Sequence, residues 1–162
     1  MMYMGIDDLK KMKTVDQVRV YLANGERLGK VLTKKDTEAW LRSNMPKESY
    51  FQKAIIEAIK KQYPEAFVRK ISLGAYSEGG LPDIMAIVGG HYFGFEVKRP
   101  IIGKPSKLQE ATIKAIQHAG GTAAVVCWPE EALKIIERGQ VPELGVIYAI
   151  GDALDEAMKN MY

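Results

Sequence analysis

Two β-strand patterns joined by a pair of glycines place the strongest constraint on the fold of this chain. Residues 83–88 form a short apolar run behind Pro82, a residue that suits the first position of a strand. Residues 92–98 alternate in polarity, and side chains two apart share one face of a strand. Gly89 and Gly90 lie between the two runs and predict a tight hairpin turn. The runs should therefore pair side by side, about 5 Å apart.

This hairpin is expected to bring three charged side chains to one point. The apolar residues at alternate positions from 93 to 97 form the core face, so Glu96 and Lys98 share the other face, roughly 7 Å apart along the strand. Asp83 begins the neighbouring strand. Two carboxylates and an ammonium at one point can bind a hard divalent cation and activate a water against a phosphodiester. The alternative is an exposed ion cluster in which Glu96 pairs with Lys98 or Arg99, and such pairs contribute little to stability.

The order of the motifs resembles a known family. Its elements are Glu48 on a predicted helix, the glycine-rich loop that leads to Pro82-Asp83, the Glu96-x-Lys98 strand, and Ser106-x-x-Gln109. Pro-Asp followed by Glu-x-Lys is the signature of the PD-(D/E)xK nuclease superfamily, and the ordered set over residues 46–128 looks like the virus-type replication-repair nuclease (VRR-NUC) domain.

The resemblance implies an α/β fold with a restriction-endonuclease-like PD-(D/E)xK core. Its elements would follow the order α-β-β-β-α-β, as a mixed sheet flanked by helices, which the periodicities also favour. The first 45 residues fall outside the resemblance, so we expect a helical N-terminal extension (1–45) and a VRR-NUC-like nuclease domain (46–162). Helices are expected at 7–24 and 33–43 in the extension. In the nuclease domain, the apolar run 122–128 predicts a central strand covered on both faces.

The catalytic set that follows comprises Asp83, Glu96, Lys98, Glu48 and Gln109. Asp83 and Glu96 offer hard oxygens that suit Mg²⁺ or Mn²⁺ better than zinc. The main-chain carbonyl of Val97 and the carboxylate of Glu48 are further candidate metal ligands, and Lys98 would orient the attacking water.

Two of these residues also have purely structural interpretations. Glu48 extends the apolar stripe of a predicted helix at 47–62, but it also suits a helix dipole at the first turn. Gln109 completes a capping box with Ser106, while the resemblance places it near the active site behind Lys98. The capping role and the active-site role would compete for one amide.

Charge is distributed unevenly along the chain and suggests a nucleic-acid partner. Residues 1–107 carry 19 Lys and Arg against 12 Asp and Glu, whereas residues 108–162 carry 4 against 8. The candidate contacts to a phosphate backbone are Ser77, Arg99, Lys104 and Lys107. The alternative for the basic cluster is a solvated surface.

Composition excludes several other classes of protein. One cysteine, Cys127, forms no internal disulfide, and this favours a reducing, cytoplasmic setting. No apolar run approaches the roughly 20 residues of a membrane span, so no membrane partner is expected. The apolar segment 144–150 is expected to be an edge strand or the contact of a homodimer, and 152–160 a helix.

The predicted function is a divalent-metal-dependent DNA endonuclease of the hydrolase class. The resemblance suggests specificity for branched DNA, as in Holliday-junction resolvases of phage replication and repair. One alternative is a flap or linear-duplex DNA nuclease with the same chemistry. The other is a DNA-binding module without catalysis.

Overall fold

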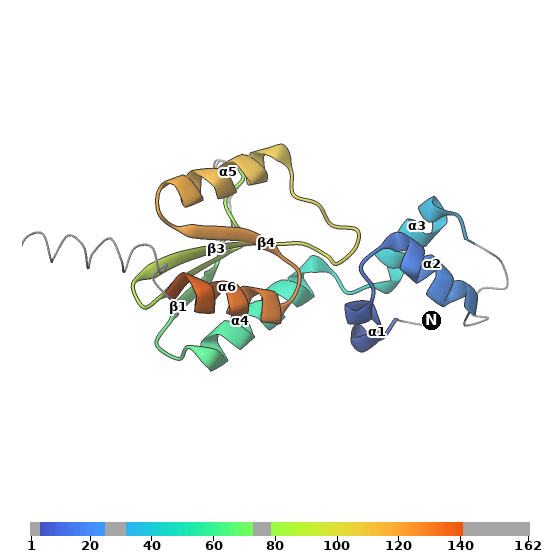
Figure 1. The fold of residues 1–162 in the computed structure, drawn as a ribbon, viewed down its shortest axis with the longest axis horizontal. Helices are drawn as coiled ribbons and strands as arrows, with labels where there is room; N and C mark the ends of the chain where they lie inside the picture. Colours follow the sequence, from blue (N-terminus) through green and yellow to red (C-terminus); the bar gives the residue numbers. More distant parts are fainter. Residues whose placement is uncertain (1–3, 25–31, 73–78, 141–162) are drawn as a thin grey trace, which may run out of the picture.

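The structure is a computed structural model that describes residues 4–24, 32–72 and 79–140 (Figure 1). The helices are α1 (Ile6–Lys11), α2 (Val15–Asn24), α3 (Lys34–Asn44), α4 (Glu48–Gln62), α5 (Lys107–His118) and α6 (Pro129–Gln140). The strands are β1 (Phe67–Lys70), β2 (Ile84–Val88), β3 (His91–Val97) and β4 (Thr122–Val126). From α4 onward, the chain order is therefore α-β-β-β-α-β.

The four strands form one mixed sheet in the order β1-β2-β3-β4. The pairs β1–β2 and β2–β3 are antiparallel, and β3–β4 is parallel. The predicted hairpin is confirmed: Val88 pairs with His91, and the two glycines between them have φ of 58° and 81°. Both values suit a type I′ turn, which favours glycine because both central residues need positive φ. A mixed sheet with flanking helices is thus confirmed.

Helices cover both faces of this sheet, and they bury the inner strand β3 from Phe93 to Val97. Figure 1 shows α4 and α6 on one face and α5 on the other. On the α4 and α6 side, Phe93, Phe95 and Val97 have no measurable exposure. On the α5 side, Glu96 is only 1% exposed. The α5 face of the hairpin is therefore buried at Glu96, although Ile87 on the same face is 41% exposed. A charged group at the position of Glu96 needs partners inside the protein.

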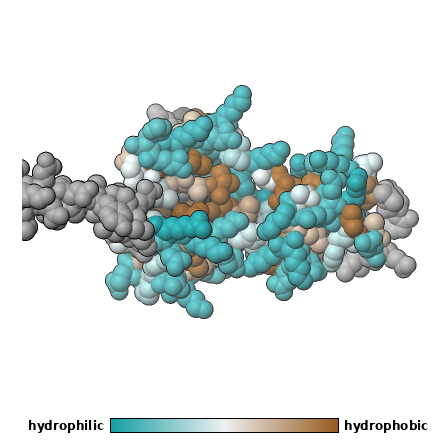
Figure 2. Space-filling view, in the orientation of Figure 1, coloured by the Kyte–Doolittle hydropathy of each residue, from teal (hydrophilic) through white to brown (hydrophobic). Residues whose placement is uncertain are grey.

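The prediction of a central position for residues 122–128 is wrong within the described sheet, because β4 is its last strand. Helices α5 and α6 both pack on β4, which explains the apolar composition of the segment. An apolar run indicates that both faces of a strand are covered by other elements. It does not indicate that the strand has a hydrogen-bonded neighbour on each edge. Val125 remains 39% exposed, and hydrophobic surface lies along β4 between α5 and α6 in Figure 2.

The expected single helix at 7–24 is also wrong, because it is two helices. Thr14 and Gln17 form a reciprocal pair at the start of α2: the Gln17 amide donates to Thr14 Oγ1 (3.2 Å), and the Thr14 amide donates to Gln17 Oε1 (3.2 Å). Such a Thr-x-x-Gln pair satisfies amides that a helix start leaves free. The expected second helix exists as α3, and a capping box between Thr33 and Asp36 opens it.

The N-terminal helices contact the sheet-bearing part of the chain. Leu9, Leu22 and Leu41 belong to the same buried hydrophobic cluster as Trp128. Lys10 Nζ of α1 lies 2.6 Å from Glu130 Oε1 of α6. The division at residue 45 remains a prediction, but the two parts share one core.

Several expectations fall outside the described residues. These are the edge strand or homodimer contact at 144–150, the helix at 152–160, and the phosphate contact at Ser77. In the part of the chain that is described, no helix is both long enough and apolar enough to cross a lipid bilayer.

Candidate active site

Asp83 is fixed at the junction of three strands. Its carbonyl accepts the amide of Ile71 just beyond β1 (2.7 Å), and its side-chain Oδ2 accepts the amide of Val97 on β3 (2.8 Å). The antiparallel register that pairs Ile84 with Phe95 brings the start of β2 to the end of β3. The side chain of Asp83 therefore reaches across the hairpin to the strand that carries Glu96.

Glu96 is the buried centre of the site. Its Oε1 accepts hydrogen bonds from Lys98 Nζ (2.5 Å) and from Gln109 Nε2. Its Oε2 is fully buried and has no donor among the described residues. Burial raises the pKa of this carboxyl, the hydrogen bond from Lys98 lowers it, and the charge of Asp83 raises it again, with a net rise. Because Asp83 Oδ2 accepts the amide of Val97, the residue next to Glu96, the two carboxyl groups lie in the same part of the sheet.

Lys98 lies on the same face as Glu96, as the strand period predicts. Its amide donates to the Val126 carbonyl of β4 (3.0 Å), which extends the parallel pairing past the end of β3. Burial acts to lower the pKa of its ammonium, but the hydrogen bond to Glu96 and the charges of Glu96, Glu48 and Asp83 raise the pKa overall. The Lys98 and Glu96 side chains are only 12% and 1% exposed, so the alternative of an exposed ion cluster is wrong.

Gln109 makes both the capping contact and a contact to the candidate site, which seemed to compete. Its Oε1 accepts the amide of Ser106 (2.8 Å) and completes the capping box of α5, while its Nε2 donates to Glu96 Oε1. An amide side chain has a separate acceptor and donor, so one residue can cap the helix and orient the carboxylate. The start of α5 is thereby coupled to the centre of the site.

Glu48 lies at the edge of this group, at the first position of α4. It is half-buried, and burial raises the pKa of its carboxyl. The charge of Lys98 acts against this shift, and that of Asp83 adds to it. Across the described residues, no three His, Cys, Asp or Glu side chains are close enough together to form a metal-binding group. Glu48 therefore interacts with the charges of Lys98 and Asp83. Its role as a direct metal ligand remains a prediction, and so does that of the Val97 carbonyl.

The expected nucleic-acid contacts separate into two kinds. Lys104 and Lys107 are exposed, beside the start of α5. The Arg99 side chain instead bonds to the C-terminal end of α3, through Nη2 to the carbonyls of Arg42 and Met45 (3.0 Å each). This structural role was not predicted from the sequence. The only signal for it was an arginine next to Lys98, and nothing in the sequence pointed to α3 as its partner.

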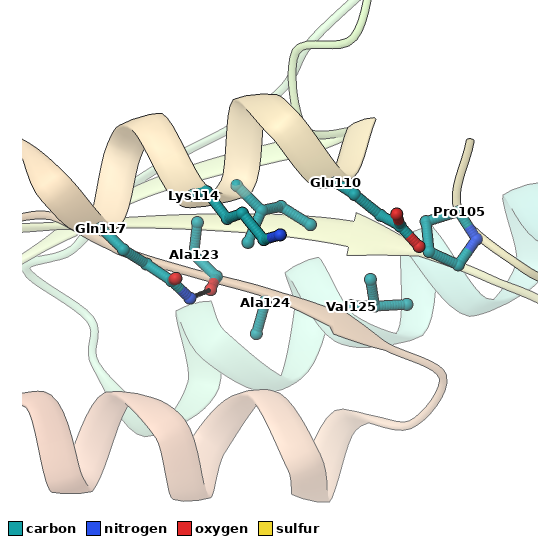
Figure 3. A pocket seen from close by; sticks show the side chains of 8 residues that line it. Pro105, Glu110, Lys114, Gln117, Ala123, Ala124 and Val125 are labelled. Atoms are coloured by element: carbon teal, nitrogen blue, oxygen red, sulfur yellow. Dashed lines mark hydrogen bonds between the residues drawn. The ribbon is translucent and has the colours of Figure 1, made fainter. Parts of the chain in front are cut away.

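A separate cavity of about 540 Å³ lies between α5 and β4 (Figure 3). Lys114, Gln117 and Glu110 line it from α5, and Ala123–Val125 line it from β4. Gln117 Nε2 points to the Ala123 carbonyl, at 2.8 Å. None of Glu48, Asp83, Glu96, Lys98 and Gln109 lines this cavity, although Val125, the β4 partner of Glu96, does.

Comparison with known proteins gives a structural likeness. No family model matches the chain, and no curated protein matches it. The chain is similar to a solved structure described as "VRR_NUC domain", with 27% sequence identity and a TM-score of 0.47. The aligned region covers 56% of this chain and 94% of that one. That solved structure carries the name of the same family that the order of the motifs resembles.

Proposed function

We propose that this chain is a nuclease that hydrolyses phosphodiester bonds in DNA with the help of a divalent metal ion. One observation carries the proposal: the buried carboxylate of Glu96 has an oxygen without a donor among the described residues, directly beside Asp83 and Lys98. Buried polar atoms nearly always have partners, and a partnerless carboxylate oxygen beside a second carboxylate suits a cation.

The donor set fits magnesium or manganese. Mg²⁺ is typically held by one or two carboxylates and keeps several waters, so a third protein carboxylate is not required. Asp83 and Glu96 would hold the ion, and Glu48 and the Val97 carbonyl are the further candidate ligands. Both carboxylates are hard oxygen donors, which select magnesium and manganese over metals that prefer nitrogen and sulfur.

A bound ion of this kind lowers the pKa of its water and offsets the negative charge that develops on the phosphate. The remaining tasks fall to the protein. Lys98, kept cationic by its acidic neighbours, orients the attacking water and stabilises the developing charge. Gln109 fixes the carboxylate of Glu96, and the Val97 amide fixes that of Asp83.

The nucleic-acid substrate is proposed from charge. Lys104 and Lys107 are exposed beside α5, whose first turn reaches the site through Gln109. Phosphate contacts of this kind give sequence-independent, salt-sensitive binding. Specificity for branched DNA, as in a resolvase, is proposed from the resemblance of the motifs alone.

A cleavage assay tests the proposal. Labelled four-way junction, flap, nicked and plain duplex DNA are incubated with Mg²⁺, Mn²⁺ or EDTA. We expect cleavage with either metal and none with EDTA. Asp83→Asn and Lys98→Ala should retain DNA binding and lose cleavage. Equal cleavage of all four substrates would exclude the resolvase preference. An intact substrate under every condition, with the wild-type protein bound to it, would replace the nuclease by a DNA-binding module.

A further inference from the structure

The guanidinium of Arg99 closes the C-terminal end of α3. Its Nη2 donates to the carbonyl oxygens of Leu41 (3.3 Å), Arg42 (3.0 Å) and Met45 (3.0 Å). Carbonyls at the end of a helix lack partners within the helix and favour a nearby cation. The contact joins residues that are 54 to 58 positions apart, so it ties the N-terminal helices to the strand end that carries Lys98.

Arg99 also begins a compact turn directly after Lys98. The amide of Gly103 donates back to the Arg99 carbonyl at 2.9 Å. Within this turn, Ile101 has φ of 69°, a left-handed conformation that β-branched residues seldom adopt. Such a conformation persists only where the surrounding structure holds it in place. The turn therefore needs an external support, and Arg99 supplies a contact to α3 at its first residue.

The turn packs directly on the base of the Lys98 side chain. A Cβ atom at Gly103 would lie 2.9 Å from Lys98 Cβ and 2.7 Å from the Arg99 carbonyl oxygen, which leaves no free space. On its other side, the Lys98 amide is held by Val126 of β4. A shift of the turn would consequently move Lys98.

We propose that Arg99 is a positioning residue for Lys98, and that the end of α3 is part of the active-site scaffold. The carbonyls of α3 hold Arg99, Arg99 holds the turn, and the turn sets the Lys98 ammonium against Glu96. The inference rests on the proposed function in one respect, since it is the nuclease reaction that needs Lys98 in place. It assigns the N-terminal helices a role in catalysis that the nuclease motifs do not contain.

The contacts of the Arg99 side chain favour this positioning role over the phosphate contact that the sequence suggested. The Nη2 of Arg99 is engaged by three backbone carbonyls, and its Nε is buried. Burial also lowers the pKa of the guanidinium. The side chain is therefore directed into the protein. A phosphate contact predicts a change in KM when Arg99 is removed, whereas a positioning role predicts a change in kcat.

Three variants of the full chain test the inference. In Arg99→Ala we expect kcat to fall by about 100-fold, the scale of a small misplacement of a catalytic group, with KM nearly unchanged. Arg99→Lys should recover much of the loss, because one ammonium has three hydrogens for three carbonyls. Lys10→Ala is the matched control: it removes the contact of α1 with Glu130 but lies outside the Lys98 turn, so kcat should be kept.

An equal loss of kcat in Lys10→Ala and Arg99→Ala would overturn the inference, and so would a rise in KM with kcat unchanged. Amide hydrogen exchange, without DNA or metal, decides the same question independently of activity. The Gly103 amide should exchange faster in Arg99→Ala than in the wild type, and an unchanged rate would contradict the inference. If the wild type cleaves no DNA, the proposed function fails, and the exchange measurement still tests the support of the turn.

Discussion

At the scale of residues, the site is a small network in which each polar group limits the freedom of another. Glu96 is bound by Lys98 and Gln109 through the same oxygen, Oε1, and this leaves the buried Oε2 without a donor among the described residues. The Val97 amide orients Asp83 from the backbone of the same strand. Preorganised donors and charges of this kind are the main source of electrostatic catalysis.

The dual role of Gln109 predicts a separation of stability from activity. Ser106→Ala removes one capping hydrogen bond to Gln109 and should cost about 1 kcal/mol of unfolding free energy, with kcat retained. Gln109→Ala should cost a similar amount of stability and also lower activity by about 10- to 100-fold, the usual effect of losing a residue that orients a metal ligand. Denaturant unfolding and kcat measure the two effects. Equal kcat in the two variants would show that Gln109 has no role in the reaction beyond capping α5.

The raised pKa of Glu96 predicts a pH-dependent stability in EDTA. Because the folded protein binds this proton more tightly than the unfolded chain, the group stabilises the fold at pH below its unfolded pKa. That contribution is lost as pH rises through the folded pKa. The Tm of the wild type, relative to Glu96→Gln, should therefore fall from acid to neutral pH, and Mg²⁺ should restore it. A constant difference in Tm would contradict the shift.

At the scale of elements, the site is formed where β2, β3 and α5 each contribute one end. The hairpin sets Asp83 against Glu96, and the capping box of α5 brings Gln109 onto the same carboxylate. The turn after β3 then controls Lys98. The turn belongs to the site because it packs directly on the Lys98 side chain.

Gly103→Ala should damage both the turn and the reaction. The new Cβ would lie 2.7 and 2.8 Å from backbone atoms of Arg99. Because backbone atoms cannot move away without distorting the turn, we expect the free energy of unfolding to fall by about 1–3 kcal/mol. We also expect a lower kcat. Gly120→Ala is the control, since Gly120 has φ of 87° but open space around it. It should cost about 1–2 kcal/mol through backbone strain alone and keep kcat. Thermal unfolding and steady-state cleavage distinguish the two.

Sequence pattern was sufficient for this local geometry and insufficient for the long-range contacts. A period of two and a glycine pair predicted that Asp83, Glu96 and Lys98 converge, because strand geometry and turn chemistry are local. The bond from Arg99 to α3 joins segments far apart in the sequence, and no local pattern encodes it. The predicted central position of β4 was wrong for a related reason. Apolar composition indicates that both faces of a strand are covered, whereas the strands beside it depend on the topology of the whole sheet.

At the scale of the whole molecule, the N-terminal helices and the sheet share one hydrophobic cluster, and polar contacts at Lys10 and at Arg99 join them further. The charge of the chain is biased toward residues 1–107, which contain the candidate carboxylates. An excess of Lys and Arg in the part of the chain that holds the candidate carboxylates suits a polyanionic substrate whose reacting phosphate meets a metal ion.

Salt dependence of DNA binding tests this arrangement. Lys104→Ala and Lys107→Ala should each lower the slope of log K against log salt concentration by about 1, with kcat at saturating DNA unchanged. Lys134→Ala, on α6, is the control and should leave the slope as it is. Identical slopes in all three variants would place the DNA elsewhere on the molecule.

Binding of Mn²⁺ to the protein without DNA shows whether Asp83 and Glu96 hold a metal ion, and it requires neither the correct substrate nor turnover. Titration calorimetry or electron paramagnetic resonance would compare the wild type with Asp83→Asn, Glu96→Gln and Lys104→Ala. We predict that the wild type and Lys104→Ala bind Mn²⁺ alike and that both carboxylate variants lose most of this binding. A wild type that binds no Mn²⁺, or carboxylate variants that bind it as tightly as the wild type, would contradict a metal site at Asp83 and Glu96.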